Sequence, residues 1–154
     1  MAVRYFAYGS NMSEKVMAER CPGHTSLGRA LLPDHRLVFS RRSIRSGTGV
    51  MDVAPSPGSQ VWGALYELDE DGLAVIDRKE GAGWAYERAP VMVLPEGEPP
   101  EVEAVTYRVI SPEPVEVPPS REYVENLIRS ARERGLPDDY VRQLETFRER
   151  AEAV

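Results

Sequence analysis

A short strand that ends at a glycine, just before a helix, is the feature that most constrains this chain. Residues 3–8 are rich in aromatic and β-branched side chains, which predicts a short and well-buried strand. Gly9 ends this strand, and the polar residues after it lead into a helix expected near Lys15. Asn11 and Glu14 have the spacing of a capping box. The sequence therefore predicts a strand, a glycine turn and a capped helix start in succession.

The junction at Gly9 is expected to direct several free backbone N–H groups at one spot, where an anion or a developing oxyanion can be held. Gly9 lacks a Cβ atom, so a ligand can approach the backbone closely there. The chain contains neither G-x-x-x-x-G-K-[ST] nor G-x-G-x-x-G, which excludes the common nucleotide-binding loops. On spacing alone, two interpretations stay open: an anion-binding loop and a purely structural turn.

Length, charge and hydropathy narrow the class of protein. The 154 residues match one ordinary domain, so residues 1–154 are expected to fold as a single unit. A net charge of −6 disfavours nucleic acid as a partner, because an acidic surface repels phosphate backbones. A mean hydropathy of −0.41, with no apolar run of about 18 residues, argues against a membrane protein. We expect a monomer or homodimer.

Cys21, the single cysteine, fits a reducing compartment, so a cytoplasmic location is expected. Cys21 and His24 have the C-x-x-H spacing of some metal sites, but carboxylates would have to complete a closed zinc site. A cysteine nucleophile with a histidine base is a second functional interpretation. Because Cys21 lies where a helix is expected to end at Pro22-Gly23, we interpret it as structural.

Apolar runs separated by turn residues predict a sheet in the middle of the chain. Strands are expected at residues 37–39, 50–54, 61–68 and 102–110, with a turn at 55–58 and a strand region at 84–94. Pro90 is expected to break that last region, as a bulge or an edge. The loop at residues 40–49 carries Arg41, Arg42 and Arg45, which we interpret as a solvated cluster, with anion binding as the alternative.

A short helix expected over residues 70–79, closed by Gly81, places one carboxylate in an unusual position. At about 100° per residue, Glu80 falls on the apolar stripe that also contains Leu73 and Ile76. Burial and the negative end of the helix dipole both disfavour the charged carboxylate, so the pKa of Glu80 should be raised. A general base or acid that works near neutral pH requires such a shift. The alternative is that the helix frays and Glu80 reaches solvent.

The last third of the chain is expected to be helical. A proline-rich connector over residues 111–119 precedes a helix capped by Ser120 and ended by Gly135. A final helix is expected to begin at residues 136–138. The charged tail from about residue 148 is expected to fray.

Three segments, in this order, resemble the γ-glutamylcyclotransferase family. The first is Tyr-Phe-Ala-Tyr-Gly-Ser-Asn-Met at residues 5–12. The second is residues 58–63 followed by residues 76–81, whose D-x-x-E-G pattern is the context of the family's essential glutamate. The third is residues 119–123 followed by Gly-Leu-Pro at 135–137, and it is more similar to the γ-glutamyl-peptide branch than to the γ-glutamylamine branch.

The resemblance implies an α+β fold, with a mixed β-sheet curled into a small barrel and flanking helices. It assigns Glu80 as the catalytic proton acceptor, and Tyr107 as a further aromatic position of the pocket. The residues that it implies for substrate binding are Tyr5, Phe6, Ala7, Tyr8, Gly9, Ser10, Asn11, Tyr86 and Tyr123. The chemistry needs no metal and no organic cofactor.

The implied reaction converts a small γ-glutamyl amide, of the kind found in glutathione metabolism, into 5-oxoproline and an amine or amino acid. One alternative is a cyclotransferase for γ-glutamylamines or γ-glutamyl secondary metabolites. Another is a non-catalytic module that binds a γ-glutamyl group or carboxylate, but Glu80 argues against it, because an anionic ligand gains nothing from a nearby carboxylate. The segment at residues 84–86 and the arginine-rich loop depart from familiar members, which leaves the leaving group open.

Overall fold

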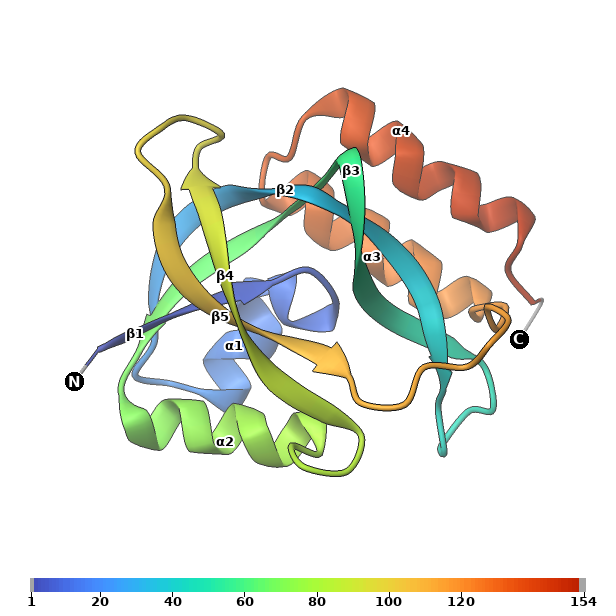
Figure 1. The fold of residues 1–154 in the computed structure, drawn as a ribbon, viewed down its shortest axis with the longest axis horizontal. Helices are drawn as coiled ribbons and strands as arrows, with labels where there is room; N and C mark the ends of the chain where they lie inside the picture. Colours follow the sequence, from blue (N-terminus) through green and yellow to red (C-terminus); the bar gives the residue numbers. More distant parts are fainter. Residues whose placement is uncertain (1, 153–154) are drawn as a thin grey trace.

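The structure, a computed structural model, describes residues 2–152, in which five strands close into a barrel flanked by helices (Figure 1). The strands are β1 (Val3–Ala7), β2 (Thr25–Arg42), β3 (Gly49–Leu68), β4 (Tyr86–Pro95) and β5 (Val102–Val109). The helices are α1 (Glu14–Arg20), α2 (Glu70–Glu80), α3 (Arg121–Glu133) and α4 (Asp138–Glu145), with 3₁₀ turns η1 (Ser10–Met12) and η2 (Thr146–Glu149). The expected α+β class with a small mixed barrel is confirmed.

The barrel has the strand order β1-β3-β2-β4-β5 and closes where β5 returns to β1. That closing pair is parallel, with Tyr5 opposite Val105, while the other neighbouring strands are antiparallel. In Figure 1, α2 lies below the strands, and α3 and α4 lie on the opposite side. The chain therefore brings the end of β1, the end of α2 and the face of α3 around one end of the barrel.

The prediction of a turn at residues 55–58 is wrong, because β3 continues through these residues. The register shifts there: Pro33 pairs with Gln60 and His35 with Pro55, so Asp34 alone faces the four residues 56–59. The Gly58 amide donates to Asp34 Oδ1 over 3.0 Å. The turn-forming residues are thus accommodated as a bulge inside a long strand pair, where a bulge bends and twists the sheet.

The break expected at Pro90 is absent, although its position at an edge is correct. β4 runs without a break over Tyr86–Pro95, and Pro90 pairs in register with Val105 of β5. On its other side β4 meets β2 only at Leu94 and Pro95. Pro90 therefore has no second neighbouring strand, and its missing N–H removes no ladder hydrogen bond.

The prediction that Asn11 and Glu14 form a capping box is also wrong. The 3₁₀ turn η1 comes between Gly9 and α1, and Ser13 is the N-cap, with its Oγ accepting from the Val16 amide over 3.3 Å. Asn11 is only 2% exposed, and its side chain is bound elsewhere. A tertiary contact has thus overridden a local capping preference.

Helix α2 begins and ends where its caps require. Asp69 Oδ1 accepts from the Gly72 amide over 2.7 Å, and Gly81 takes the left-handed conformation with φ of 64°. A glycine carries no penalty in that conformation. The helix therefore keeps its last turn, and Glu80 is its final residue.

The tail from residue 148, expected to fray, is attached to the rest of the chain in its described part. The Glu152 amide donates to the Pro119 carbonyl over 2.8 Å, and the Arg121 amide donates to the Glu152 carbonyl over 3.0 Å. Arg148 pairs with Glu125 over 2.7 Å. Residues 153 and 154 lie outside the described residues.

One continuous core joins the barrel to the helices. Phe6, Tyr66, Ile76, Val124 and Leu144 come from five different elements and are all at most 1% exposed. Burying one such large apolar side chain contributes about 1.5–3 kcal/mol. The elements that carry the candidate site are therefore fixed to one packed interior. Within residues 2–152, no helix is both long and apolar enough to cross a membrane.

Candidate active site

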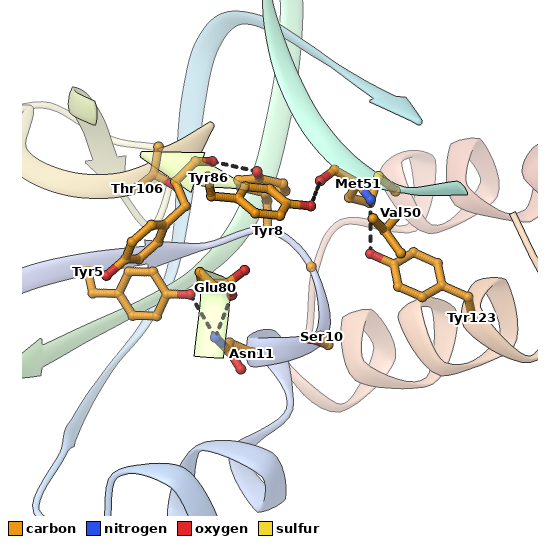
Figure 2. A pocket seen from close by; sticks show the side chains of 12 residues that line it. Tyr5, Tyr8, Ser10, Asn11, Val50, Met51, Glu80, Tyr86, Thr106 and Tyr123 are labelled. Atoms are coloured by element: carbon orange, nitrogen blue, oxygen red, sulfur yellow. Dashed lines mark hydrogen bonds between the residues drawn. The ribbon is translucent and has the colours of Figure 1, made fainter. Parts of the chain in front are cut away.

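A cavity of about 190 Å³ lies where β1 ends, between the barrel strands, α2 and α3 (Figure 2). The twelve residues that line it are Tyr5, Tyr8, Gly9, Ser10, Asn11, Val50, Met51, Glu80, Tyr86, Thr106, Tyr107 and Tyr123. The first and last of these residues, Tyr5 and Tyr123, are 118 positions apart in the chain. The cavity is a product of the tertiary fold.

Backbone contacts fix three of the tyrosines in the cavity wall. Tyr8 Oη donates to the Tyr107 carbonyl over 2.6 Å, and Tyr86 Oη donates to the Met51 carbonyl over 2.8 Å. The Met51 amide donates to Tyr123 Oη over 3.1 Å. Burial raises the pKa of Tyr8, Tyr86 and Tyr123 above the ordinary tyrosine value. These hydroxyls are therefore neutral, and they form a polar, uncharged wall.

Glu80 presents its carboxyl group to this cavity from the last residue of α2 (Figure 2). Its Oε1 accepts from Asn11 Nδ2 over 3.3 Å. Burial raises the pKa of Glu80, and the charge of Arg20 acts in the opposite direction. The direction expected from helix periodicity is thus found, because enclosure by the cavity walls disfavours the charged carboxylate.

Asn11 connects three other side chains at the base of the cavity. Arg20 donates from Nη1 to Asn11 Oδ1, while Asn11 Nδ2 donates to Tyr5 Oη over 2.9 Å and to Glu80. Because a guanidinium can only donate, Arg20 fixes which end of the Asn11 amide faces Glu80. Arg20 was not among the expected site residues, since no local sequence signal relates the end of α1 to Glu80.

A second carboxylate, one turn earlier in α2, has the opposite environment. Asp77 Oδ1 accepts from Arg88 Nε over 2.9 Å and from Tyr107 Oη over 2.6 Å. The hydrogen bond from Arg88 lowers the pKa of Asp77 below its usual range, and the Tyr107 hydroxyl adds to this effect. Two acids of one helix therefore differ in environment: Asp77 is held charged by its partners, whereas burial favours the neutral form of Glu80.

Two backbone amides at the start of η1 are free to bind a ligand. The Met12 amide donates to the Gly9 carbonyl and the Ser13 amide to the Ser10 carbonyl. The amides of Ser10 and Asn11 donate to no acceptor within residues 2–152. Both residues line the cavity, so the sequence expectation of free N–H groups near Gly9 agrees with the geometry.

The structure brings most of the expected site residues to one cavity, but not all of them. Tyr5, Tyr8, Gly9, Ser10, Asn11, Glu80, Tyr86 and Tyr123 line it, as does Tyr107. Phe6 and Ala7 do not. The Phe6 ring packs against Gly63, where an added Cβ would lie 2.8 Å from the ring, and a Cβ there would lie 2.4 Å from the Ala7 carbonyl oxygen. Val50, Met51 and Thr106 were not expected, because an apolar or small strand residue gives no local signal of a site.

Cys21 and His24 lie away from this cavity and contact protein groups. The Cys21 thiol donates to the Gly72 carbonyl over 3.3 Å, and burial raises its pKa. His24 Nδ1 lies 2.7 Å from the Cys21 carbonyl oxygen, and its Nε2 contacts Glu14. Among the side chains of residues 2–152, no group of three or more His, Cys, Asp or Glu could hold a metal ion.

Comparisons with known proteins agree on one class. A solved structure described as a γ-glutamyl cyclotransferase has a TM-score of 0.85 at 29% identity and covers 94% of this chain and 87% of that chain. Gamma-glutamylcyclotransferase of Homo sapiens is 30% identical over 148 residues, covering 93% of this chain and 77% of that protein. The Bos taurus protein of the same name is 28% identical over 147 residues, with the same coverage.

The fold and the site therefore define the γ-glutamylcyclotransferase-like class of small mixed barrels. An AIG2-like protein of Mus musculus has a TM-score of 0.59 at 24% identity, covering 73% of this chain and 80% of that chain, which is likeness of fold alone. The AIG2-like family profile matches residues 60–144. The chain belongs to the AIG2-like family, and the resemblance first seen in its sequence motifs is confirmed.

Proposed function

We propose that this protein is a γ-glutamylcyclotransferase, which releases 5-oxoproline from a γ-glutamyl amide. The names of its curated relatives support this activity. The observation that carries the proposal is that Glu80 is the single carboxyl group among the twelve lining residues, and that its pKa is raised. A lone, partly buried carboxylate beside uncharged hydroxyls suits proton transfer to and from a bound amine.

The cavity matches the two charges of a γ-glutamyl head group. Its α-ammonium group is attracted by Glu80, which lies on the wall formed by α2. The free amides of Ser10 and Asn11 are suited to its α-carboxylate or to the oxyanion that develops on the γ-carbonyl. The neutral hydroxyl groups of the cavity wall can donate or accept without adding charge.

The α-ammonium group first loses a proton to solvent, because its nitrogen has no lone pair with which to attack. From the resulting free α-amine, the reaction needs one bond formed, one bond broken and one proton moved. Glu80 takes a proton from the α-amine as its nitrogen attacks the γ-carbonyl and closes the five-membered lactam. The tetrahedral intermediate then expels the leaving nitrogen, which receives that proton from Glu80. Both reacting groups belong to one molecule, and well-oriented intramolecular reactions reach effective molarities of about 10⁵ M or more. The main tasks of the enzyme are therefore to hold the substrate in a conformation suited to attack and to transfer one proton.

Incubation of the purified protein with a panel of γ-glutamyl peptides and γ-glutamylamines tests the proposal, with 5-oxoproline measured by mass spectrometry. The expected result is catalytic release of 5-oxoproline from at least one member. Saturable binding of these compounds without product would instead favour the non-catalytic module. The cytoplasmic location, the single-domain organisation and the monomeric or homodimeric state remain predictions from the sequence.

A further inference from the structure

Trp84 is exposed to a degree that packing of the fold does not explain. Its side chain is 64% exposed, whereas tryptophan is usually highly buried. The indole nevertheless contacts the backbone at Gly81, because a Cβ added there would lie only 2.7 Å from it. Gly81 directly follows Glu80, so the indole lies against the backbone beside the proposed base.

Arg41 lies over this indole and is adjacent to residues that line the cavity. The Arg41 Cζ atom is 5.3 Å from the centre of the Trp84 ring. Arg41 pairs across the β2–β3 hairpin with Val50, which lines the cavity. Burial raises the pKa of Tyr86, another lining residue, and the charge of Arg41 opposes that rise. Arg41 and Trp84 therefore lie next to two lining residues of the cavity, Arg41 opposite Val50 and Trp84 against the glycine that follows Glu80. The tip of the β2–β3 hairpin and the α2–β4 turn lie on the same side of the barrel (Figure 1).

A second arginine–tryptophan pair in this protein provides a comparison. Arg29 lies over Trp62 with its Cζ atom 5.4 Å from the ring centre, and there Nε donates to Glu96 over 3.0 Å. Arg29 also donates to the Gly135 carbonyl. The Arg41 guanidinium has neither a carboxylate partner nor any other acceptor within residues 2–152. It therefore presents free donors, in a geometry suited to a carboxylate, beside an exposed aromatic face.

We infer that Arg41 and Trp84 bind the leaving group, and that Arg41 selects leaving groups that carry a carboxylate. This inference rests on the proposed function, in which the leaving nitrogen receives its proton from Glu80 and must therefore lie on the Glu80 side of the cavity. An amino acid or short peptide then lies across Trp84 with its carboxylate on Arg41. A γ-glutamylamine, which lacks that carboxylate, is the poorer substrate.

A hollow between α1 and α3, of about 380 Å³, is the competing exit for the leaving group. It shares Ser10 and Tyr123 with the cavity and contains Lys15 and Arg129. Glu133 also lines it, and its negative charge opposes a carboxylate. Since this hollow adjoins the Ser10 side and Arg129 already donates to Asn126 over 2.8 Å, the observations favour the side that carries Arg41.

Two matched substrate pairs test the inference, because the members of each pair differ by one charge. The pairs are γ-glutamyl-alanine against γ-glutamyl-alaninamide, and γ-glutamyl-alanyl-glycine against its C-terminal amide. For the wild-type protein we expect kcat/KM to favour the free acid about tenfold or more in at least one pair, as a charge-assisted hydrogen bond provides. Turnover without preference in either pair overturns the inference and leaves the proposed function standing, whereas no turnover at all removes the proposed function.

Four variants show which residues cause the preference for the free acid. Arg41→Gln should bring the ratio of acid to amide close to one, and Arg41→Lys should restore part of it. Arg45→Gln removes the same charge from the same hairpin, where Arg45 is exposed, and should keep the wild-type ratio. A ratio that survives Arg41→Gln but is lost in Lys15→Gln/Arg129→Gln assigns the leaving group to the α1–α3 hollow and overturns the inference.

Discussion

Asn11 and Glu80 are 69 positions apart in the chain, and Asn11 Nδ2 donates to Glu80 Oε1 over 3.3 Å. This contact joins the turn after β1 to the end of α2, the two parts of the proposed site. It also explains why Asn11 is not a helix cap, because its amide is already used by Glu80, Tyr5 and Arg20. The site is therefore assembled by buried side-chain contacts between segments whose local sequence gives no sign of the pairing.

The charge of Arg20 should set where enzyme activity falls at acid pH. Proton acceptance requires ionised Glu80, so kcat/KM should decrease as pH falls through its raised pKa. Arg20 acts against that rise, so Arg20→Gln should move the acid limb to higher pH, although glutamine can still donate to Asn11. Arg20→Lys keeps the charge and should stay nearer the wild-type profile. An unmoved limb in Arg20→Gln would show that Arg20 does not tune Glu80.

Glu80→Gln should make the protein more stable at neutral pH. Below the ordinary glutamate pKa the carboxyl is protonated in both native and unfolded states, so the charge costs nothing there. Above the raised native pKa, burial of the carboxylate destabilises the native state, and each unit of displacement corresponds to about 1.4 kcal/mol. The stability difference between Glu80→Gln and wild type should thus grow as pH rises and vanish in acid.

Chemical unfolding measured across this pH range checks that prediction. Glu19→Gln is the control, because Glu19 is exposed and should change stability little at any pH. A Glu80→Gln protein less stable than wild type at neutral pH would mean that the Glu80 charge stabilises the fold.

Gly9→Ala should weaken substrate binding and leave the fold intact. Gly9 has φ of −116°, and an added Cβ would lie 3.6 Å from Tyr123 Oη, an ordinary contact. The methyl group would instead occupy space in the cavity, and we expect KM to rise about tenfold, equivalent to ~1.4 kcal/mol of crowding. Steady-state kinetics and the thermal unfolding midpoint measure both effects.

Gly49→Ala serves as the opposite case. A Cβ there would lie 1.9 Å from the Val117 carbonyl oxygen, so this variant should lose stability by a few kcal/mol or fail to fold. Unchanged KM and kcat in Gly9→Ala would indicate that the Gly9 turn has a structural role only.

Local sequence signals predicted the parts of the site that depend on local structure. The β1 strand, the left-handed cap at Gly81 and the apolar stripe that directs Glu80 inward all follow from short-range patterns. The family motifs added the barrel and the tyrosines at positions 86 and 123. These elements were predictable because neighbouring residues along the chain decide them.

The remaining features depend on tertiary contacts. The turn residues at 55–58 form a bulge because β2 and β3 pair along their length, and pairing partners are not encoded in either segment alone. Asn11 leaves its capping position because Glu80 and Arg20 reach it from other elements. The contribution of Arg20 and the stacking of Arg41 on Trp84 likewise arise between segments far apart in sequence.

The most direct test of the account is the rate of 5-oxoproline formation by Glu80→Gln compared with wild type, measured on one γ-glutamyl peptide that the wild-type protein turns over. Glutamine keeps the size of the side chain and an oxygen for Asn11, but it cannot accept the proton. The account predicts a fall in kcat of roughly 100-fold to 10,000-fold with the fold retained. A well-folded Glu80→Gln protein that forms 5-oxoproline at close to the wild-type rate would contradict it.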